Sequence, residues 1–127
     1  MKLRIKGESL RLRVSRSELD RIFRGERVEE TIHFSSDPDA KLTYSLEKAS
    51  HAASTGVHYS PGQIAVLLAE EEVETWGHPS QVGIYTSVAN GSVNRLELAI
   101  EKDYACLDGS IEDNTDTFDN PHAAGTC

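Results

Sequence analysis

The stretch KLRIKGESLRLRV, residues 2–14, alternates apolar and basic side chains as a half-buried β-strand does. Its apolar residues are odd-numbered before Gly7 and even-numbered after it. This change of phase predicts either a bulge in one bent strand or a turn at GES between two short strands. If the apolar side faces the core, the other side carries up to five cations: Lys2, Arg4, Lys6, Arg11 and Arg13.

A short helix is expected over residues 17–25. Ser17 is the candidate N-cap, acidic residues occupy the first turn, and Gly25 can end the helix. Its apolar residues fall on one face at helical spacing. A second helix of one or two turns is expected over residues 70–77, where Val73 and Trp76 face the same way.

Strand-like segments occur in pairs separated by turn sequences. Residues 27–34 and 41–47 flank SSDPDA, and residues 81–88 and 92–102 flank ANGS, whose Asn-Gly dipeptide favours a type I′ turn. The stretch 55–69 allows either two strands around a Pro-Gly turn or a helix capped by a serine. We favour the two strands, because residues 64–68 form a compact apolar run.

These elements predict an α+β fold, with a mainly antiparallel curled sheet or small partly open barrel and two short helices. At 127 residues, the chain fits one domain, which we place at residues 1–107, followed by an acidic C-terminal extension at 108–127. No apolar run approaches the length of a membrane span and no secretory signal opens the chain, so a cytoplasmic location without membrane contact is expected. The sequence leaves the oligomeric state open.

Charge is distributed unevenly along the chain. Residues 1–27 carry nine Lys or Arg against four acids, whereas residues 28–127 carry four against seventeen, giving a net charge of −8. An acidic surface repels phosphate backbones, so nucleic acid is not an expected partner. The basic face either binds a small anion or an acidic protein partner, or pairs with acids on neighbouring strands. We favour pairing, and the candidate partners are Glu29, Glu30, Glu97 and Glu101.

Three segments carry a family resemblance: MKLRIKGESLRLRVSRSELDRIFRGERVEETIHF at the start, QVGIY in the middle, and LEKAS…IEKDYACL…DNPHA towards the end. They resemble a family of small uncharacterised bacterial proteins, which implies a single cytoplasmic domain and transfers no catalytic residue. The pattern also resembles the CYTH-type triphosphate-tunnel barrels, which implies a metal-dependent barrel that binds triphosphates or phosphate esters. The Glu-x-Glu-x-Lys signature of those barrels is replaced here by Lys2, Arg4 and Lys6.

Candidate metal ligands lie near the end of the chain. Cys106, His122 and Cys127 are suitable zinc ligands, and His33, His51, His58 or His78 could complete a tetrahedral site. Their spacing lacks paired C-x-x-C motifs, and two cysteines do not make a disulfide framework. We favour the alternative in which Cys106 packs as a small apolar residue at the end of a strand. Zinc is the one cofactor these residues suggest; otherwise none is expected.

The extension after residue 107 is predicted to fold back onto the domain. Phe118 and Pro121 are its bulky apolar groups, and its acids could lie near the basic face. The sequence contains no P-loop and no G-x-S-x-G motif. We therefore expect a non-catalytic binding or accessory protein, with a phosphate-ester or triphosphate-binding barrel and a zinc-stabilised protein as the alternatives.

Overall fold

The computed structural model describes residues 1–91 and 95–104. These residues form eight strands and two helices. In chain order the elements are β1 (Lys2–Lys6), β2 (Ser9–Val14), α1 (Arg16–Phe23), β3 (Val28–His33), β4 (Lys41–Ala49), β5 (Gly56–Ser60), β6 (Gln63–Ala69), α2 (Glu70–Trp76), β7 (Gly83–Val88) and β8 (Leu96–Lys102).

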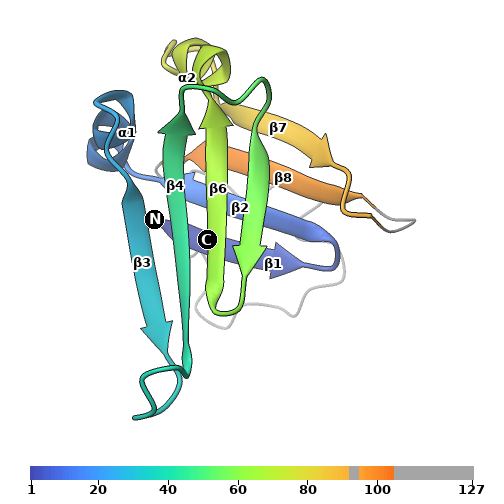
Figure 1. The fold of residues 1–127 in the computed structure, drawn as a ribbon. Coiled ribbons are helices and arrows are strands. Elements are labelled where there is room, and N and C mark those ends of the chain that lie inside the picture. Colours follow the sequence, from blue (N-terminus) through green and yellow to red (C-terminus); the bar gives the residue numbers. More distant parts are fainter. Residues whose placement is uncertain (92–94, 105–127) are drawn as a thin grey trace, which may run out of the picture.

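The strands form two four-stranded sheets that lie against each other (Figure 1). The first sheet has the order β1-β2-β8-β7 and the second has the order β3-β4-β6-β5. Sequential hairpins supply four antiparallel pairs, while β2 with β8 and β4 with β6 are parallel. Segments distant in sequence therefore meet at the centre of each sheet.

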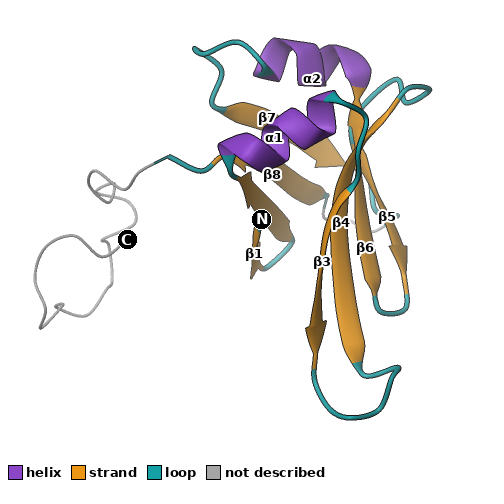
Figure 2. Ribbon diagram, turned by 90° about the vertical axis from the view of Figure 1, so that its left-hand side faces the viewer, coloured by secondary structure: helices purple, strands orange, loops and turns teal. Residues whose placement is uncertain are grey.

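Both helices cover the same end of the two sheets, where the core lies (Figure 2). Trp76 in α2 is 1% exposed, and its indole Nε1 donates a hydrogen bond to the Val82 carbonyl at 3.1 Å. The core combines apolar residues from both sheets and both helices: Leu12, Val14, Leu19, Ile22, Val28, Leu46, Val66, Leu68, Val73, Trp76, Ile84, Leu98 and Ile100. Neither described helix has the length and apolar run needed to cross a membrane.

The change of phase at Gly7 is a turn between two strands and not a bulge. Gly7 has φ +53°, a backbone conformation that favours glycine. Because β1 and β2 then run antiparallel, Leu3 lies opposite Leu12 and Ile5 lies opposite Leu10. The odd-numbered apolar residues of one strand and the even-numbered ones of the other share a face, as the alternation predicted.

Helix α1 begins one residue before its predicted start, and its N-cap is Ser15. The Ser15 hydroxyl accepts a hydrogen bond from the Glu18 amide at 3.3 Å, and the Glu18 carboxylate accepts one from the Ser15 amide at 2.9 Å. This is a capping box, which satisfies two amides that the helix itself leaves unpaired. The prediction of Ser17 as the N-cap was wrong because Glu18 stands three residues after Ser15, as this motif requires.

The predicted α+β class, the short helices and the strand pairings of the hairpins are confirmed. The two-residue type I′ turn predicted at Asn90-Gly91 was wrong, because the register pairs Val88 with Leu96 and the connection between β7 and β8 is therefore longer. Residues 56–60 and 63–69 are the two strands that we favoured over a helix. Within residues 1–91 and 95–104 the strands divide into two curled sheets and do not close into a barrel. The boundary predicted at residue 107, the extension at 108–127 and its anchors Phe118 and Pro121 lie outside the described residues.

Candidate functional site

The outer face of the first sheet holds the five cations that the sequence placed on one side of residues 2–14: Lys2, Arg4, Lys6, Arg11 and Arg13. The strand register places outward side chains in cross-strand rows that run from β1 through β2 and β8 to β7. The three rows are Lys2, Arg13, Glu101 and Gly83; Arg4, Arg11, Ala99 and Tyr85; and Lys6, Ser9, Glu97 and Ser87. We call this surface the basic face.

Three of the five cations are paired with acids. The Arg11 Nε lies 3.2 Å and the Arg13 Nε 3.6 Å from Oε1 of Glu101, and the Lys2 Nζ lies 2.9 Å from Oδ2 of Asp103. Glu101 is only 14% exposed, so its charge is less screened than that of a fully exposed acid. Cross-strand pairing, which we favoured from the sequence, is thus present over one half of the basic face.

Arg4 and Lys6 occupy the other half, and both are exposed. Neither forms an ion pair with any residue in the described part of the chain. Arg4 also stands directly opposite Arg11 in the register of β1 and β2. Like charges opposite one another on a sheet destabilise the pairing, so an anion bound here would relieve a repulsion.

Two of the expected partner acids lie elsewhere. Glu29 and Glu30 belong to β3 in the second sheet, where the Arg27 Nε lies 3.2 Å from Glu29 Oε2. Glu30 contacts the N-terminus instead. The prediction that these two acids pair with the basic face was wrong because β1 is an edge strand of the first sheet and has only β2 beside it.

A groove of about 550 Å³ runs over the basic face. Ligand pockets typically have volumes of roughly 300–1,000 Å³, so a small molecule fits this space. Arg4, Lys6 and Arg11 line one side, and Tyr85 and Ser87 line the other. Between them lies Ala99, which has the shortest side chain of its cross-strand row. The centre of the groove is therefore low.

Tyr85 is fixed to the same carboxylate that pairs with the arginines. Its hydroxyl donates a hydrogen bond of 2.6 Å to Oε2 of Glu101. Partial burial, this hydrogen bond and the charge of Glu101 together raise the pKa of Tyr85 to about 12, because each disfavours the phenolate. Oε1 of Glu101 accepts no hydrogen bond within the described residues, since the nearby Arg11 N–H is close without being aligned. Tyr85 is therefore held over the groove as a neutral ring.

Polar contacts continue at the far end of the groove. The Ser87 hydroxyl donates a hydrogen bond of 2.9 Å to Glu97 and accepts one of 2.8 Å from the Arg95 Nε. Arg95 also donates to the Ser87 carbonyl at 2.8 Å. This chain of contacts fixes hydroxyl and carboxylate groups between Tyr85 and the free cations.

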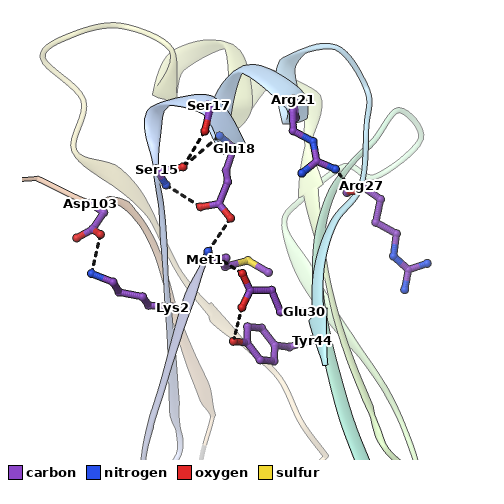
Figure 3. Close-up of polar contacts among 10 residues, drawn as sticks. All are labelled: Met1, Lys2, Ser15, Ser17, Glu18, Arg21, Arg27, Glu30, Tyr44 and Asp103. Atoms are coloured by element: carbon purple, nitrogen blue, oxygen red, sulfur yellow. Dashed lines mark hydrogen bonds and ion pairs between the residues drawn. The ribbon is translucent and has the colours of Figure 1, made fainter. Parts of the chain in front are cut away.

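A second polar cluster surrounds the N-terminus and joins the two sheets (Figure 3). The Met1 ammonium lies 2.6 Å from Glu18 Oε2 and 3.2 Å from Glu30 Oε1. The Tyr44 hydroxyl donates to the second oxygen of Glu30 at 3.3 Å. The cluster thereby ties the start of β1 to α1 and to strands β3 and β4.

The contacts of this cluster shift the pKa values of its members, among them those of Met1 and Glu18. Burial opposes the charge on Met1, but its hydrogen bonds to Glu18 and Glu30 prevail and raise the pKa of the amino group. Burial likewise opposes the charge on Glu18, but hydrogen bonds from the Met1 ammonium and from Ser15 prevail and lower the pKa of this carboxyl. The cluster is a structural link, since its charges satisfy one another.

The proposed zinc ligands Cys106, His122 and Cys127 lie outside the described residues. Within residues 1–91 and 95–104, no three His, Cys, Asp or Glu side chains gather closely enough to hold a metal ion. The zinc site therefore stays a prediction.

The resemblance to triphosphate-tunnel barrels implied cations pointing into an enclosed cavity. Instead, the five cations lie on an outer face of the described structure, while Leu12 is buried and Leu3 and Leu10 pack against the core. Ile5 departs from this pattern and is 58% exposed. In the described structure the cations therefore face solvent, and the apolar side of β2 faces the core.

Sequence reasoning found the cations and missed the opposite wall of the groove. Alternation within residues 81–88 and 92–102 already placed Tyr85 and Ser87 on one face, with Ala99 opposite. What it did not reveal is the parallel pairing of β2 with β8, which brings these residues beside Arg11.

The fold and the groove define a small two-sheet α+β domain with a basic ligand-sized surface. The comparison with protein families then places it: the family of unknown function DUF7009 matches residues 1–122, so the chain belongs to that family. This confirms the resemblance to an uncharacterised family. No curated protein and no solved structure matches the chain.

Proposed function

We propose that this protein is a non-catalytic binding domain of the bacterial cytoplasm and that its ligand is a small anion held in the groove of the basic face. The single observation that carries the proposal is the position of Arg4 and Lys6. Both are exposed cations beside a ligand-sized groove, and neither has an acidic partner among the residues described.

The charge balance of the face supports an anionic ligand. The five cations of the face and Arg95, which contacts Ser87 at the end of the groove, share this surface with three carboxylates, those of Glu97, Glu101 and Asp103, so positive charge remains in excess. This excess stands out against a chain with a net charge of −8. A local positive field on an otherwise negative molecule attracts small anions and repels long polyanions.

The groups that line the groove also suit this role chemically. The guanidinium groups of Arg4 and Arg11 donate hydrogen bonds in a planar fork that matches phosphate and carboxylate oxygens. Lys6 adds a mobile ammonium, and Ser9 adds a hydroxyl. A cytoplasmic location is supported by the low cysteine content, which offers no disulfide framework for an oxidising compartment.

The test is calorimetric titration of the full chain with inorganic phosphate and pyrophosphate at low ionic strength. The double variant Arg4→Ala/Lys6→Ala should weaken binding at least tenfold, because each charge-assisted hydrogen bond contributes about 1.5–3 kcal/mol before solvent screening. Binding to the unaltered protein should also weaken as salt is added.

The matched control is Arg16→Ala/Lys41→Ala, which removes the same two residue types from positions that do not line the groove. It should leave the affinity within twofold of the unaltered protein. Equal losses in the two variants, or no binding by the unaltered protein, would refute the proposal.

A further inference from the structure

Besides its cations, the groove has an opposite wall that contains Tyr85 and Ser87, and these groups indicate a second chemical group in the ligand. Resting on the proposed function, we infer that the bound anion is the phosphate of a nucleoside monophosphate, with its base stacked on Tyr85. The phosphate would lie at Arg4 and Lys6, and the sugar would cross the low centre of the groove above Ala99.

Tyr85 forms the aromatic wall of the groove, and a hydrogen bond holds its ring in one orientation. Tyr85 is 59% exposed, so one side of its ring is open, and its hydroxyl is fixed by Glu101 at 2.6 Å. An exposed tyrosine normally samples several rotamers, and fixing it lowers the entropy lost when a planar ligand stacks on it. A nucleobase is such a ligand, and stacking on aromatic side chains is a common way for proteins to bind it.

The width of the groove sets the distance between the Tyr85 ring and the bound anion. Arg11, Ala99 and Tyr85 stand side by side on β2, β8 and β7. Neighbouring strands lie about 4.8 Å apart, so roughly 10 Å separates the β2 and β7 backbones along this row, and roughly 14 Å separates β7 from β1, which carries Arg4 and Lys6 on long side chains. A ligand that touches both walls needs a planar group and an anionic group joined by a spacer about the size of a sugar, and Ala99 leaves room for that spacer.

The polar groups along the groove fit a ribose. Glu97 is a hydrogen-bond acceptor beside Ser87, which is itself held by Arg95. Sugar hydroxyls donate to such carboxylates. The two cations without partners match a phosphate monoester, which carries about two negative charges near pH 7.

The experiment compares adenosine 5′-monophosphate, ribose 5-phosphate and inorganic phosphate by calorimetric titration of the full chain. The nucleotide should bind roughly tenfold more tightly than ribose 5-phosphate, the ratio expected for one stacked base. Tyr85→Leu should abolish this ratio, whereas Tyr85→Phe, which keeps the ring, should retain most of it. Tyr59→Leu, which removes another exposed tyrosine from the second sheet, should leave it unchanged.

An NMR titration of the unaltered protein supplies a readout that does not depend on any variant. The nucleotide should shift the Tyr85 ring and Ala99 amide signals, and ribose 5-phosphate should shift the Ala99 amide without the ring. Phosphate binding with no gain from the base overturns the nucleotide assignment and leaves the anion site standing. A short single-stranded RNA that binds more tightly than the mononucleotide overturns it in favour of a polymer. Absence of binding by all of these ligands overturns both proposals.

Discussion

Replacing Glu18 by glutamine tests the link between the N-terminus and the first helix. The glutamine amide can still accept from the Ser15 backbone, but it lacks the charge that faces Met1 at 2.6 Å. A hydrogen bond to a charged group contributes about 1.5–3 kcal/mol, and an acid in the first helical turn about 0.3–1 kcal/mol. Glu30 still contacts the ammonium in the variant, so we expect the free energy of unfolding to fall by about 1–2 kcal/mol.

The assay is urea unfolding at a series of pH values, followed by the fluorescence of the single tryptophan, Trp76. The folded-state pKa of Glu18 lies below its ordinary value of 4.5, so its contribution is present above pH 4.5 and is lost as the pH falls through the folded-state pKa. The amino group of Met1 has a pKa raised above 8.0, so its contribution is present below pH 8.0 and is lost as the pH rises through the raised value. Glu18→Gln should weaken both dependences.

The control is Glu26→Gln, which removes an acid that contacts Arg24 at 2.9 Å on the surface. Solvent screens that pair, so its loss should leave stability unchanged within measurement error. Equal stabilities for Glu18→Gln and Glu26→Gln near pH 6 would refute the reasoning, because the capping box and the ammonium contact would then contribute no more than an exposed ion pair.

Three further changes test the packing and the groove. Gly83→Ala should lower the free energy of unfolding by about 1–3 kcal/mol in urea titrations, because an added Cβ would lie 2.5 Å from the Ile100 carbonyl oxygen. Trp76→Ala should lower it by about 3–5 kcal/mol, measured by circular dichroism, because the side chain is 1% exposed in the core. In an alkaline absorbance titration, Tyr85 should ionise near pH 12, and Glu101→Gln should lower its pKa towards 10 by removing the charge that opposes the phenolate.

Local signals were sufficient to predict most elements of this fold. The strands around Gly7 and the short second helix each depend on a few neighbouring residues. The basic face was predictable for the same reason, since a period of two fixes the side of the sheet on which Lys2 and Arg4 lie. Even the Ser15 cap had a local signal in the Ser-x-x-Glu pattern, and choosing Ser17 overlooked it.

The division into two sheets and the walls of the groove could not be predicted in this way. Both parallel pairs join strands that no short turn connects, so their pairing depends on how the whole core closes. Without the β2–β8 pair, nothing in the sequence places Tyr85 across from Arg11 or gives Glu101 two arginine neighbours. The distribution of paired and unpaired cations is therefore a tertiary property.

The pairing of β2 with β8 also bears on the biosynthesis of this protein. Ser9 lies opposite Glu97, so the middle of the first sheet joins two segments that are far apart in the chain and are synthesised at different times. Until β8 emerges, β2 of the nascent hairpin is paired with β1 alone and lacks its second neighbouring strand, and the closure of so long a loop slows folding. Completion of the first sheet is thus delayed until translation has passed residue 102, and a chain truncated before β8 should be a substrate for chaperones and proteases.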